Sequence, residues 1–325
     1  MTTKRAKKQA TKPSIQVGAL RADELEEAAR ILHVAFGTFL SLPNPMDFMG
    51  DRDFVTPRWH ARNTKLLAAR ENGKLVGSNM VTRWGSFAFF GPLTVLPEYW
   101  NRGVAQQLLA ATMKIFDRWD VRHSALFTFP NSPRHVGLYQ KFGYWPGSLT
   151  ALMKRAPAPP TWALAAGAKV PVLLSTLTSK QQEQAIEACA KLTNSFESGL
   201  DLGDEIRAVR SQRIGEVILI EGRRALDSFA VCMHGAGSEG GEKACYVKFA
   251  VARSGERFDR LLDAIDALAL ARGSEVEAGV SLACKDAFER LRSRGYRVVT
   301  LGVAMQKPHG DGFNRAASYV LNDWR

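Results

Sequence analysis

The alternation of apolar and polar positions predicts a helix followed by a hairpin near the start of the chain. Apolar residues recur at helical spacing over residues 23–39, and prolines interrupt the chain soon afterwards. Residues 65–70 and 75–84 have the pattern of two strands. The turn between them contains Asn72 and Gly73, a pair that can adopt the positive backbone angles of a hairpin. An antiparallel pair is therefore expected after the first helix.

Strands and helices then alternate up to a proline-rich break. Around and after the hairpin, the pattern predicts helices at 58–63, 104–119 and 136–142, and strands at 86–95, 124–129 and 149–154. Residues 156–171 follow, with four prolines among many alanines, a composition that cannot sustain a helix. This segment is predicted to be a linker. The mixed order of elements places the chain in the α+β class.

The order of elements recurs beyond the linker. The pattern there predicts a helix at 180–192, strands at 217–220, 229–234 and 245–252, a helix at 257–271, and a final strand, helix and strand. Aligning Val251 with Val95 also aligns Gly295 with Gly143. Such a repeat predicts two domains of similar fold in tandem. A length of 325 residues, long for one compact core, agrees with this.

The second copy lacks two features of the first. From Val95 to Leu109 the chain advances 14 positions, whereas from Val251 to Leu262 it advances only 11, so the loop between strand and helix is shorter. In addition, a leucine stands where the first copy has Tyr139. We interpret the second half as a degenerate copy of the first, with a structural role or a role in a homodimer contact.

These patterns divide the chain into four segments. They are a basic tail at 1–13, an N-terminal domain at 14–155, the linker at 156–171 and a degenerate C-terminal domain at 172–325. The tail contains five lysine or arginine residues and no acidic residue, so we expect it to be disordered.

Composition and charge argue against several classes of protein. The chain has no apolar run close to the ~20 residues that cross a bilayer, and its start lacks the apolar stretch of an export signal. The four cysteines lack the spacing of a zinc site or a disulfide framework. The net charge of +12 comes partly from the tail and is accompanied by no nucleic-acid-reading module, although it would favour an anionic cofactor. We expect a cytoplasmic protein with no metal and no membrane or nucleic-acid partner.

The segment between residues 95 and 109 contains the first chemical motif. At the turn from strand to helix stand Trp100, Asn101, Arg102, Gly103, Val104 and Ala105. This run resembles the coenzyme A loop of the GNAT N-acetyltransferase superfamily, whose pattern is Q/R-x-x-G-x-G/A, with tryptophan replacing the usual Gln or Arg. Gly103 and Ala105 would let a pyrophosphate approach backbone N–H groups at a helix amino terminus, where the helix dipole favours negative charge. An ordinary strand-to-helix turn is the alternative interpretation.

A second motif follows at the separation usual in that superfamily. Residues 131–144 contain Leu138 and Tyr139 and end in Gly143 and Tyr144. They resemble the superfamily's short helix that contains Leu-Tyr and ends in glycine and an aromatic residue. The resemblance covers about residues 15–155 when the fold is included. It implies tandem GNAT-like domains, each with a mixed, mostly antiparallel central sheet flanked by helices.

The resemblance further implies an acetyltransferase with acetyl-coenzyme A as co-substrate. The implied cofactor-binding residues are Leu93, Thr94, Val95, Asn101, Arg102, Gly103, Val104, Ala105 and Asn131. In this family an acceptor amine attacks the thioester directly while a backbone N–H near the end of the strand polarises the carbonyl. The helix tyrosine, here Tyr139, protonates the departing thiolate, although packing is an alternative role for it. No covalent enzyme intermediate is implied, and the first half has no cysteine that could form one.

The general base and the acceptor contacts stay open at this point. Many relatives have a glutamate on the strand at 86–95, but residues 89–94 contain no carboxylate. A water chain or an already neutral amine could replace it, and so could one of four histidines: His33, His60, His123 and His135. Candidate acceptor contacts, each with an alternative as a solvated or core residue, are Asp47, Asp51, Asp53, Trp59, Trp84 and Trp100.

Two functions are compatible with these motifs. The first is N-acetyl transfer from acetyl-coenzyme A to an amine of a small molecule or peptide. The second is noncatalytic binding of an acyl-coenzyme A by a sensor or interaction protein, which the missing strand carboxylate allows. Tyr139 favours the enzyme, because a sensor needs no proton donor.

Overall fold

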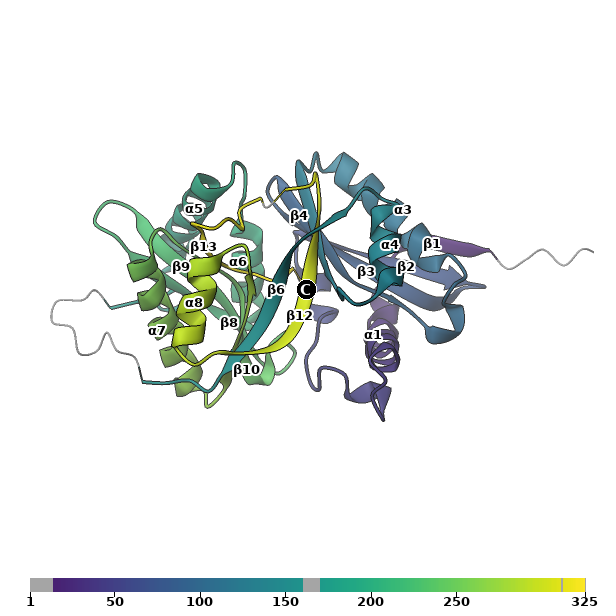
Figure 1. Cartoon of the computed structure of the whole chain (residues 1–325), viewed down its shortest axis with the longest axis horizontal. Coiled ribbons are helices and arrows are strands. Elements are labelled where there is room, and N and C mark those ends of the chain that lie inside the picture. The colour runs from purple at the N-terminus through teal and green to yellow at the C-terminus, as the bar shows by residue number, and fades with distance from the viewer. Residues whose placement is uncertain (1–13, 160–169, 311, 325) are drawn as a thin grey trace, which may run out of the picture.

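The computed structural model describes residues 14–159, 170–310 and 312–324. The expected tail at 1–13 and most of the expected linker lie outside these residues. Figure 1 shows two lobes, with the long strands β6 (Trp145–Arg155) and β12 (Arg297–Lys307) lying between them at the centre. Within the described ranges, no helix is long and apolar enough to cross a membrane.

The N-terminal lobe contains the predicted elements and one further strand at its start. Its strands are β1 (Ile15–Ala19), β2 (Thr64–Glu71), β3 (Lys74–Trp84), β4 (Phe87–Val95) and β5 (His123–Thr128). Its helices are α1 (Leu25–Phe39), α2 (Thr56–His60), α3 (Val104–Arg118) and α4 (Pro133–Gln140), with 3-10 turns at Ala22–Glu24, Pro45–Asp47 and Pro97–Tyr99. The hairpin turn is confirmed, since Asn72 and Gly73 have φ of 51° and 79°. Helices α2 and α4 begin earlier than predicted because Pro57 and Pro133 occupy their first turns.

The C-terminal lobe repeats the order of strands and helices. Its strands are β7 (Val172–Leu173), β8 (Gly215–Glu221), β9 (Leu226–Gly235), β10 (Gly241–Ala252), β11 (Glu275–Ser281) and β13 (Tyr319–Leu321). Its helices are α5 (Ser179–Phe196), α6 (Gly203–Gln212), α7 (Gly255–Ala271) and α8 (Lys285–Ser293), with a 3-10 turn at Leu174–Thr176. The sequence pattern does not predict β1, α6, β7 or β13.

The strands of both lobes form one mixed, mostly antiparallel sheet. Their order is β1-β2-β3-β4-β5-β12-β6-β11-β10-β9-β8-β7, and β13 pairs with β10 outside this path. The parallel pairs are β4 with β5 and β10 with β11, and each pair is joined by one crossover helix, α3 or α7. The structure therefore has the α+β class that the sequence predicts, with the same unit in both lobes.

The two lobes exchange one strand each. β12 comes from the end of the chain, yet it lies between β5 and β6 and pairs with both. Its residues Val303 and Met305 are buried in the core of the N-terminal lobe, together with Leu108 and Leu109 of α3. The strand predicted at 149–154 was expected to close the N-terminal domain, but it lies between β12 and β11. Local patterns could not reveal this position, because both partners of β6 are distant in sequence.

Candidate active site

One edge of β4 becomes free where β4 and β5 separate. In the described chain the two strands pair only as far as Phe89 and Ala125. The N–H of Leu96 donates to β3, so strand alternation turns the peptide groups of Leu93 and Val95 away from β3. The last part of β4 therefore presents backbone N–H and C=O groups to the space between the separated strands.

Helix α3 begins beside this free edge. Asn101 and Gly103 in the preceding loop have positive φ, 62° and 78°, and Gly103 is the N-cap residue. Apart from Gly103 and its neighbours in the chain, no atom of the described residues lies within 4 Å of the position that a Cβ of Gly103 would occupy, so the approach to the helix is open. The first backbone N–H groups of a helix have no acceptor within the helix. Those of Val104 and Ala105 therefore form a positively polarised end.

A cavity of about 540 Å³ lies between this loop, the free edge of β4, α1 and α4. Eight of the ten residues that the resemblance implies for the cofactor and for catalysis line it: Leu93, Thr94, Val95, Asn101, Gly103, Val104, Ala105 and Tyr139. Other lining residues include Phe36, Phe39, Trp100, Arg134, His135 and Lys141. The charged ones are Arg134 and Lys141, and no carboxylate is found among the described lining residues. The cavity thus favours an anionic ligand.

Two residues expected in the site do not line this cavity. The side chain of Arg102 forms an ion pair with Glu71 of β2 and lies 4.5 Å from the ring centroid of Tyr99. Asn131 is exposed in the turn before α4, where its neighbour Ser132 is the buried N-cap residue. The loop lies between a strand and a helix, but the motif does not determine which way these two side chains point.

Trp100 connects the loop to α4. Its indole Nε1–H donates to the carbonyl of Val95 at 2.7 Å, and the guanidinium of Arg134 lies 5.2 Å from its ring centroid. Arg134 makes no ion pair with any residue that the structure describes. Its positive charge is therefore available next to the amino terminus of α3.

Tyr139 is 7% exposed and forms part of the cavity wall on α4. Burial raises the pKa of its phenol to about 12, although a hydrogen bond with Thr128 of β5 opposes the shift. Its ring also packs against Phe90, with centroids 5.8 Å apart. The phenol is thus a protonated donor at neutral pH, and packing fixes its position.

His135 lies one helical turn before Tyr139 and also lines the cavity. Its Nδ1 is buried without a hydrogen-bond partner among the described residues. Burial, followed by the charge of Arg134, lowers the pKa of the imidazole, so the ring is neutral at pH 7. The ring of Phe39 contacts it edge-on, with centroids 4.8 Å apart. The other three candidate bases do not line the cavity: His33 bonds the carbonyl of Phe48, His123 bonds Gln306, and His60 is exposed.

Most of the remaining sequence candidates serve structure. Asp53 accepts the backbone N–H groups of Val55 and Thr56, Asp51 accepts that of Glu242, and Asp47 accepts a side-chain N–H of Asn44. Trp84 is buried and donates its indole N–H to Glu205, while Trp59 packs against the core below α1. Of these six residues, Trp100 alone lines the cavity.

The aromatic wall of the cavity is not predicted from the sequence. Phe36 and Phe39 of α1 line it. Phe36 stacks on Phe48 with ring centroids 5.0 Å apart, and Phe39 contacts Phe129 at 5.0 Å. The helical period of α1 marks an apolar face, but periodicity cannot distinguish a face packed in a core from one that borders a cavity.

The corresponding place in the C-terminal lobe is filled by the chain itself. β13 pairs with β10 at residues 250–252, where β10 has parted from β11. Only Arg253 and Ser254 connect β10 to α7, and the Ser254 side chain caps that helix. Leu291, the counterpart of Tyr139, is fully buried. These features agree with a degenerate second copy.

A comparison with known families identifies the N-terminal lobe. Residues 31–144 match the acetyltransferase (GNAT) family, and this segment contains the loop, the free edge of β4 and Tyr139. This segment of the N-terminal lobe therefore matches the GNAT acetyltransferase family. No curated protein matches its sequence.

Solved structures extend this likeness of fold to both lobes. A putative acetyltransferase from Pyrococcus horikoshii is 16% identical, with a TM-score of 0.69 over 98% of each chain. A GCN5-related N-acetyltransferase from Sphaerobacter thermophilus is 14% identical, with a TM-score of 0.57 over 90% of this chain and 95% of its own. A tandem GNAT protein from the clavulanic acid biosynthesis pathway is 14% identical, with a TM-score of 0.54 over 90% and 98%. The protein thus has the fold of a tandem GNAT protein.

Proposed function

We propose that this protein is an N-acetyltransferase that transfers the acetyl group of acetyl-coenzyme A directly to an amine. The proposal is carried by the convergence of three features on one cavity: the amino terminus of α3, the free edge of β4 and the phenol of Tyr139. The helix end and the strand edge suit a phosphate-bearing, extended ligand. The protonated phenol adds a proton donor that binding alone does not require.

The donor would lie along two backbone surfaces. N–H groups at residues 103–106 suit the pyrophosphate, and Arg134 and Lys141 add positive charge nearby. The amide-bearing arm would pair with the edge at residues 93–95 like an added strand. The C-terminal lobe offers an internal parallel, because β13 pairs with β10 at 250–252, the counterpart of 94–96 in the repeat.

The proposed reaction requires no covalent intermediate on the protein. The amine nitrogen attacks the thioester carbon, so that a C–N bond forms and the C–S bond breaks. Leu93 and Val95 direct backbone N–H groups into the cavity, and one of these groups would stabilise negative charge on the thioester oxygen. Tyr139 gives its proton to the departing sulfur and regains one from solvent. The amine nitrogen releases one proton, which balances the reaction.

We propose His135 as the acceptor of the amine proton. The imidazole is neutral, lies in the cavity one turn from Tyr139, and can act directly or through a water molecule. With no carboxylate in the described lining, His135 is a basic side chain in a suitable place. A residue on α4 would then perform the task that many relatives give to a strand glutamate.

The cavity wall favours an acceptor with one amino group on an aromatic or aliphatic body. Phe36 and Phe39 provide an apolar surface beside His135. A polycation would place further positive charge near Arg134 and Lys141 without a counter-ion from the described lining, which is costly. Phenethylamine is therefore a suitable first probe.

Release of free thiol from acetyl-coenzyme A tests the proposal. The assay compares phenethylamine with spermidine, glucosamine and lysine, each supplied alone. We expect kcat/KM for phenethylamine to exceed that for spermidine by about 10-fold or more, the range of discrimination by a hydrophobic pocket. A preference for spermidine would contradict the proposed apolar acceptor but would still support the proposed acyl transfer. Binding of coenzyme A without thiol release for any amine would instead support the noncatalytic sensor.

A further inference from the structure

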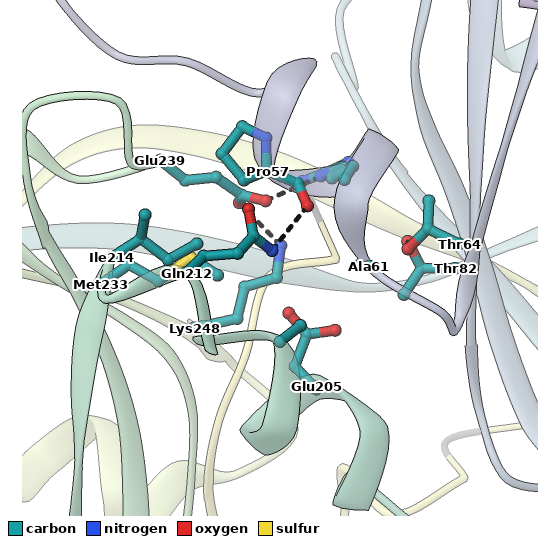
Figure 2. A pocket seen from close by; sticks show the side chains of 12 residues that line it. Pro57, Ala61, Thr64, Thr82, Glu205, Gln212, Ile214, Met233, Glu239 and Lys248 are labelled. Carbon is teal, nitrogen blue, oxygen red and sulfur yellow. Dashed lines mark hydrogen bonds and ion pairs between the residues drawn. The ribbon is translucent and has the colours of Figure 1, made fainter. Parts of the chain in front are cut away.

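A buried ionic cluster joins the C-terminal lobe to the N-terminal lobe. Glu239, in the connection between β9 and β10, accepts the Nε–H of Arg58 on α2 at 2.7 Å and an Nζ–H of Lys248 on β10 at 2.7 Å. The side chains of Arg58, Glu239 and Lys248 are only 5%, 1% and 2% exposed. Figure 2 shows Glu239 and Lys248 pointing toward each other beside Pro57.

Arg58 and Glu239 hold each other in the ionised state, whereas burial and the charge of Arg58 lower the pKa of Lys248. Burial alone would raise the pKa of Glu239, but Arg58 and Lys248 outweigh it and lower this pKa to about 2. The pKa of Arg58 is raised, because Glu239 outweighs the opposing effect of burial. At neutral pH the guanidinium is thus fixed by a charged partner that belongs to the other lobe.

The surrounding contacts dock the same connection of the C-terminal lobe onto the segment that leads to Arg58. The N–H of Asp53 donates to the carbonyl of Ser238 at 3.1 Å. Gly241 packs so closely on Asp51 that a Cβ at position 241 would lie 2.5 Å from a carboxylate oxygen. Arg58 is therefore held in a close-fitting contact between lobes, where large displacements of its side chain are costly.

The second hydrogen bond of Arg58 reaches β4. Its Nη1–H donates to the carbonyl of Gly91 at 2.5 Å. Gly91 lies two residues before Leu93, whose peptide group faces the cavity. The pairing of β4 with β3 also shifts register here, between Phe90 and Leu93. A strand at such an irregularity has fewer regular ladder bonds to fix its direction, so a side-chain contact has more influence on it.

We propose that Arg58 is a positioning residue for the free edge of β4, and that Glu239 of the C-terminal lobe holds it in place. The contacts run from the Glu239 carboxylate through the Arg58 guanidinium and the Gly91 carbonyl to the peptide group of Leu93. The C-terminal copy, whose own site is filled by β13, thereby acts on the site of its neighbour. This inference rests on the proposed function for what the edge binds.

The test compares Arg58→Lys with a matched control, Arg155→Lys. Arg155 also joins a buried carboxylate to a backbone carbonyl, since it donates to Asp266 at 2.9 Å and to the carbonyl of Arg294 at 2.6 Å. It does not line the cavity. In both variants lysine keeps the charge but loses the fork that serves two acceptors at once. A difference between the two variants therefore reflects the contact of Arg58 with β4 and not the general effect of replacing a buried arginine.

We expect hydrogen exchange of residues 90–96 to become faster in Arg58→Lys and to stay unchanged in Arg155→Lys. With acetyl-coenzyme A and the panel amine that reacts fastest, kcat of Arg58→Lys should fall about 10- to 100-fold, the usual cost of a misplaced reacting group. Affinity for coenzyme A, measured by calorimetry, should fall less than kcat, because the amino terminus of α3 still binds the pyrophosphate. Equal exchange and equal kcat in the two variants would overturn the inference, as would an equal fall of kcat and affinity with a lower thermal midpoint.

A second variant isolates the part played by the C-terminal lobe. Glu239→Gln combined with Lys248→Met removes one charge of each sign, so the net charge of the cluster is preserved. It should reproduce the faster exchange at residues 90–96, and unchanged exchange would show that Glu239 does not hold Arg58. If the unmodified protein releases no thiol, the proposed function fails, but the exchange experiment still decides whether Arg58 positions β4.

Discussion

Tyr139 illustrates how one buried residue can serve both packing and chemistry. A pKa of about 12 makes its phenol a weaker acid than an ordinary thiol, whose pKa is about 8.5. Burial also raises the pKa of a thiol, so a sulfur that leaves inside the same cavity is a better proton acceptor than one in water. Proton donation is therefore most favourable while the sulfur is still in the cavity.

Replacement of Tyr139 by phenylalanine should separate the two roles. Tyr139→Phe keeps the ring that packs against Phe90, so folding and coenzyme A affinity should hold. We expect turnover to fall by about 10²- to 10⁴-fold if proton transfer limits the rate. Steady-state kinetics and calorimetry measure the two effects. Unchanged kcat, with chemistry shown to limit the rate, would mean that water protonates the thiolate.

The pH dependence of the rate should report on His135 rather than on Tyr139. Burial holds the pKa of His135 below its ordinary value of 6.5, so the base is lost only as pH falls through that lower value. We expect an acidic limb of kcat below pH 6.5 and, because the phenol stays protonated to about pH 12, no basic limb from Tyr139. His135→Gln should lower the plateau and remove the acidic limb. If the acidic limb persists in this variant, a group other than His135 produces it.

At the scale of elements, coenzyme A binding is expected to depend on the amino terminus of α3. Gly103→Val should weaken coenzyme A binding, because a side chain would enter the open approach to the helix. Gly273→Val is the matched control, since Gly273 also has positive φ and open space but lies after α7. Both variants should lose about 1–2 kcal/mol of unfolding free energy from the left-handed backbone. Only Gly103→Val should lose affinity in calorimetry.

The same titration should give one site per chain. In the C-terminal lobe β13 already pairs with β10 at 250–252, and Ser254 caps α7, so the described residues leave no free edge and no open helix end at this place. Two equivalent sites, or tight binding by Gly103→Val, would contradict this assignment.

Local features of the fold and site could be predicted from the sequence, and features made by distant contacts could not. The hairpin turn follows from Asn72 and Gly73, and the loop and Tyr139 follow from motifs with a fixed spacing. The ion pair of Arg102 with Glu71, by contrast, depends on which strand the loop packs against. The contact of Arg58 with Gly91 likewise depends on how the lobes dock. Contacts of this kind, between residues that are distant in the sequence, leave no periodic pattern of apolar and polar positions.

At the scale of the whole molecule, the exchange of β6 and β12 makes each lobe depend on the other. β12 forms ladders with β5 and β6, and its Val303 and Met305 are buried in the core of the N-terminal lobe. β6 in turn pairs with β11 over residues 150–155. The two lobes thus share one sheet, and the proposed active site rests on a strand, β12, that comes from the C-terminal part of the chain.

A chain cut between residues 159 and 170 should therefore remain a single particle with unchanged coenzyme A affinity. The fragments are joined by three strand ladders and a common core, so they should separate only when denaturant unfolds both. Size-exclusion chromatography and native mass spectrometry of the cut protein test this. The isolated fragment 1–159 should be insoluble, because without β12 the edge of β5 and the apolar surface around Leu126 and Tyr144 are exposed. A soluble, monomeric fragment that binds coenzyme A would show that the N-terminal lobe folds without its exchanged strand.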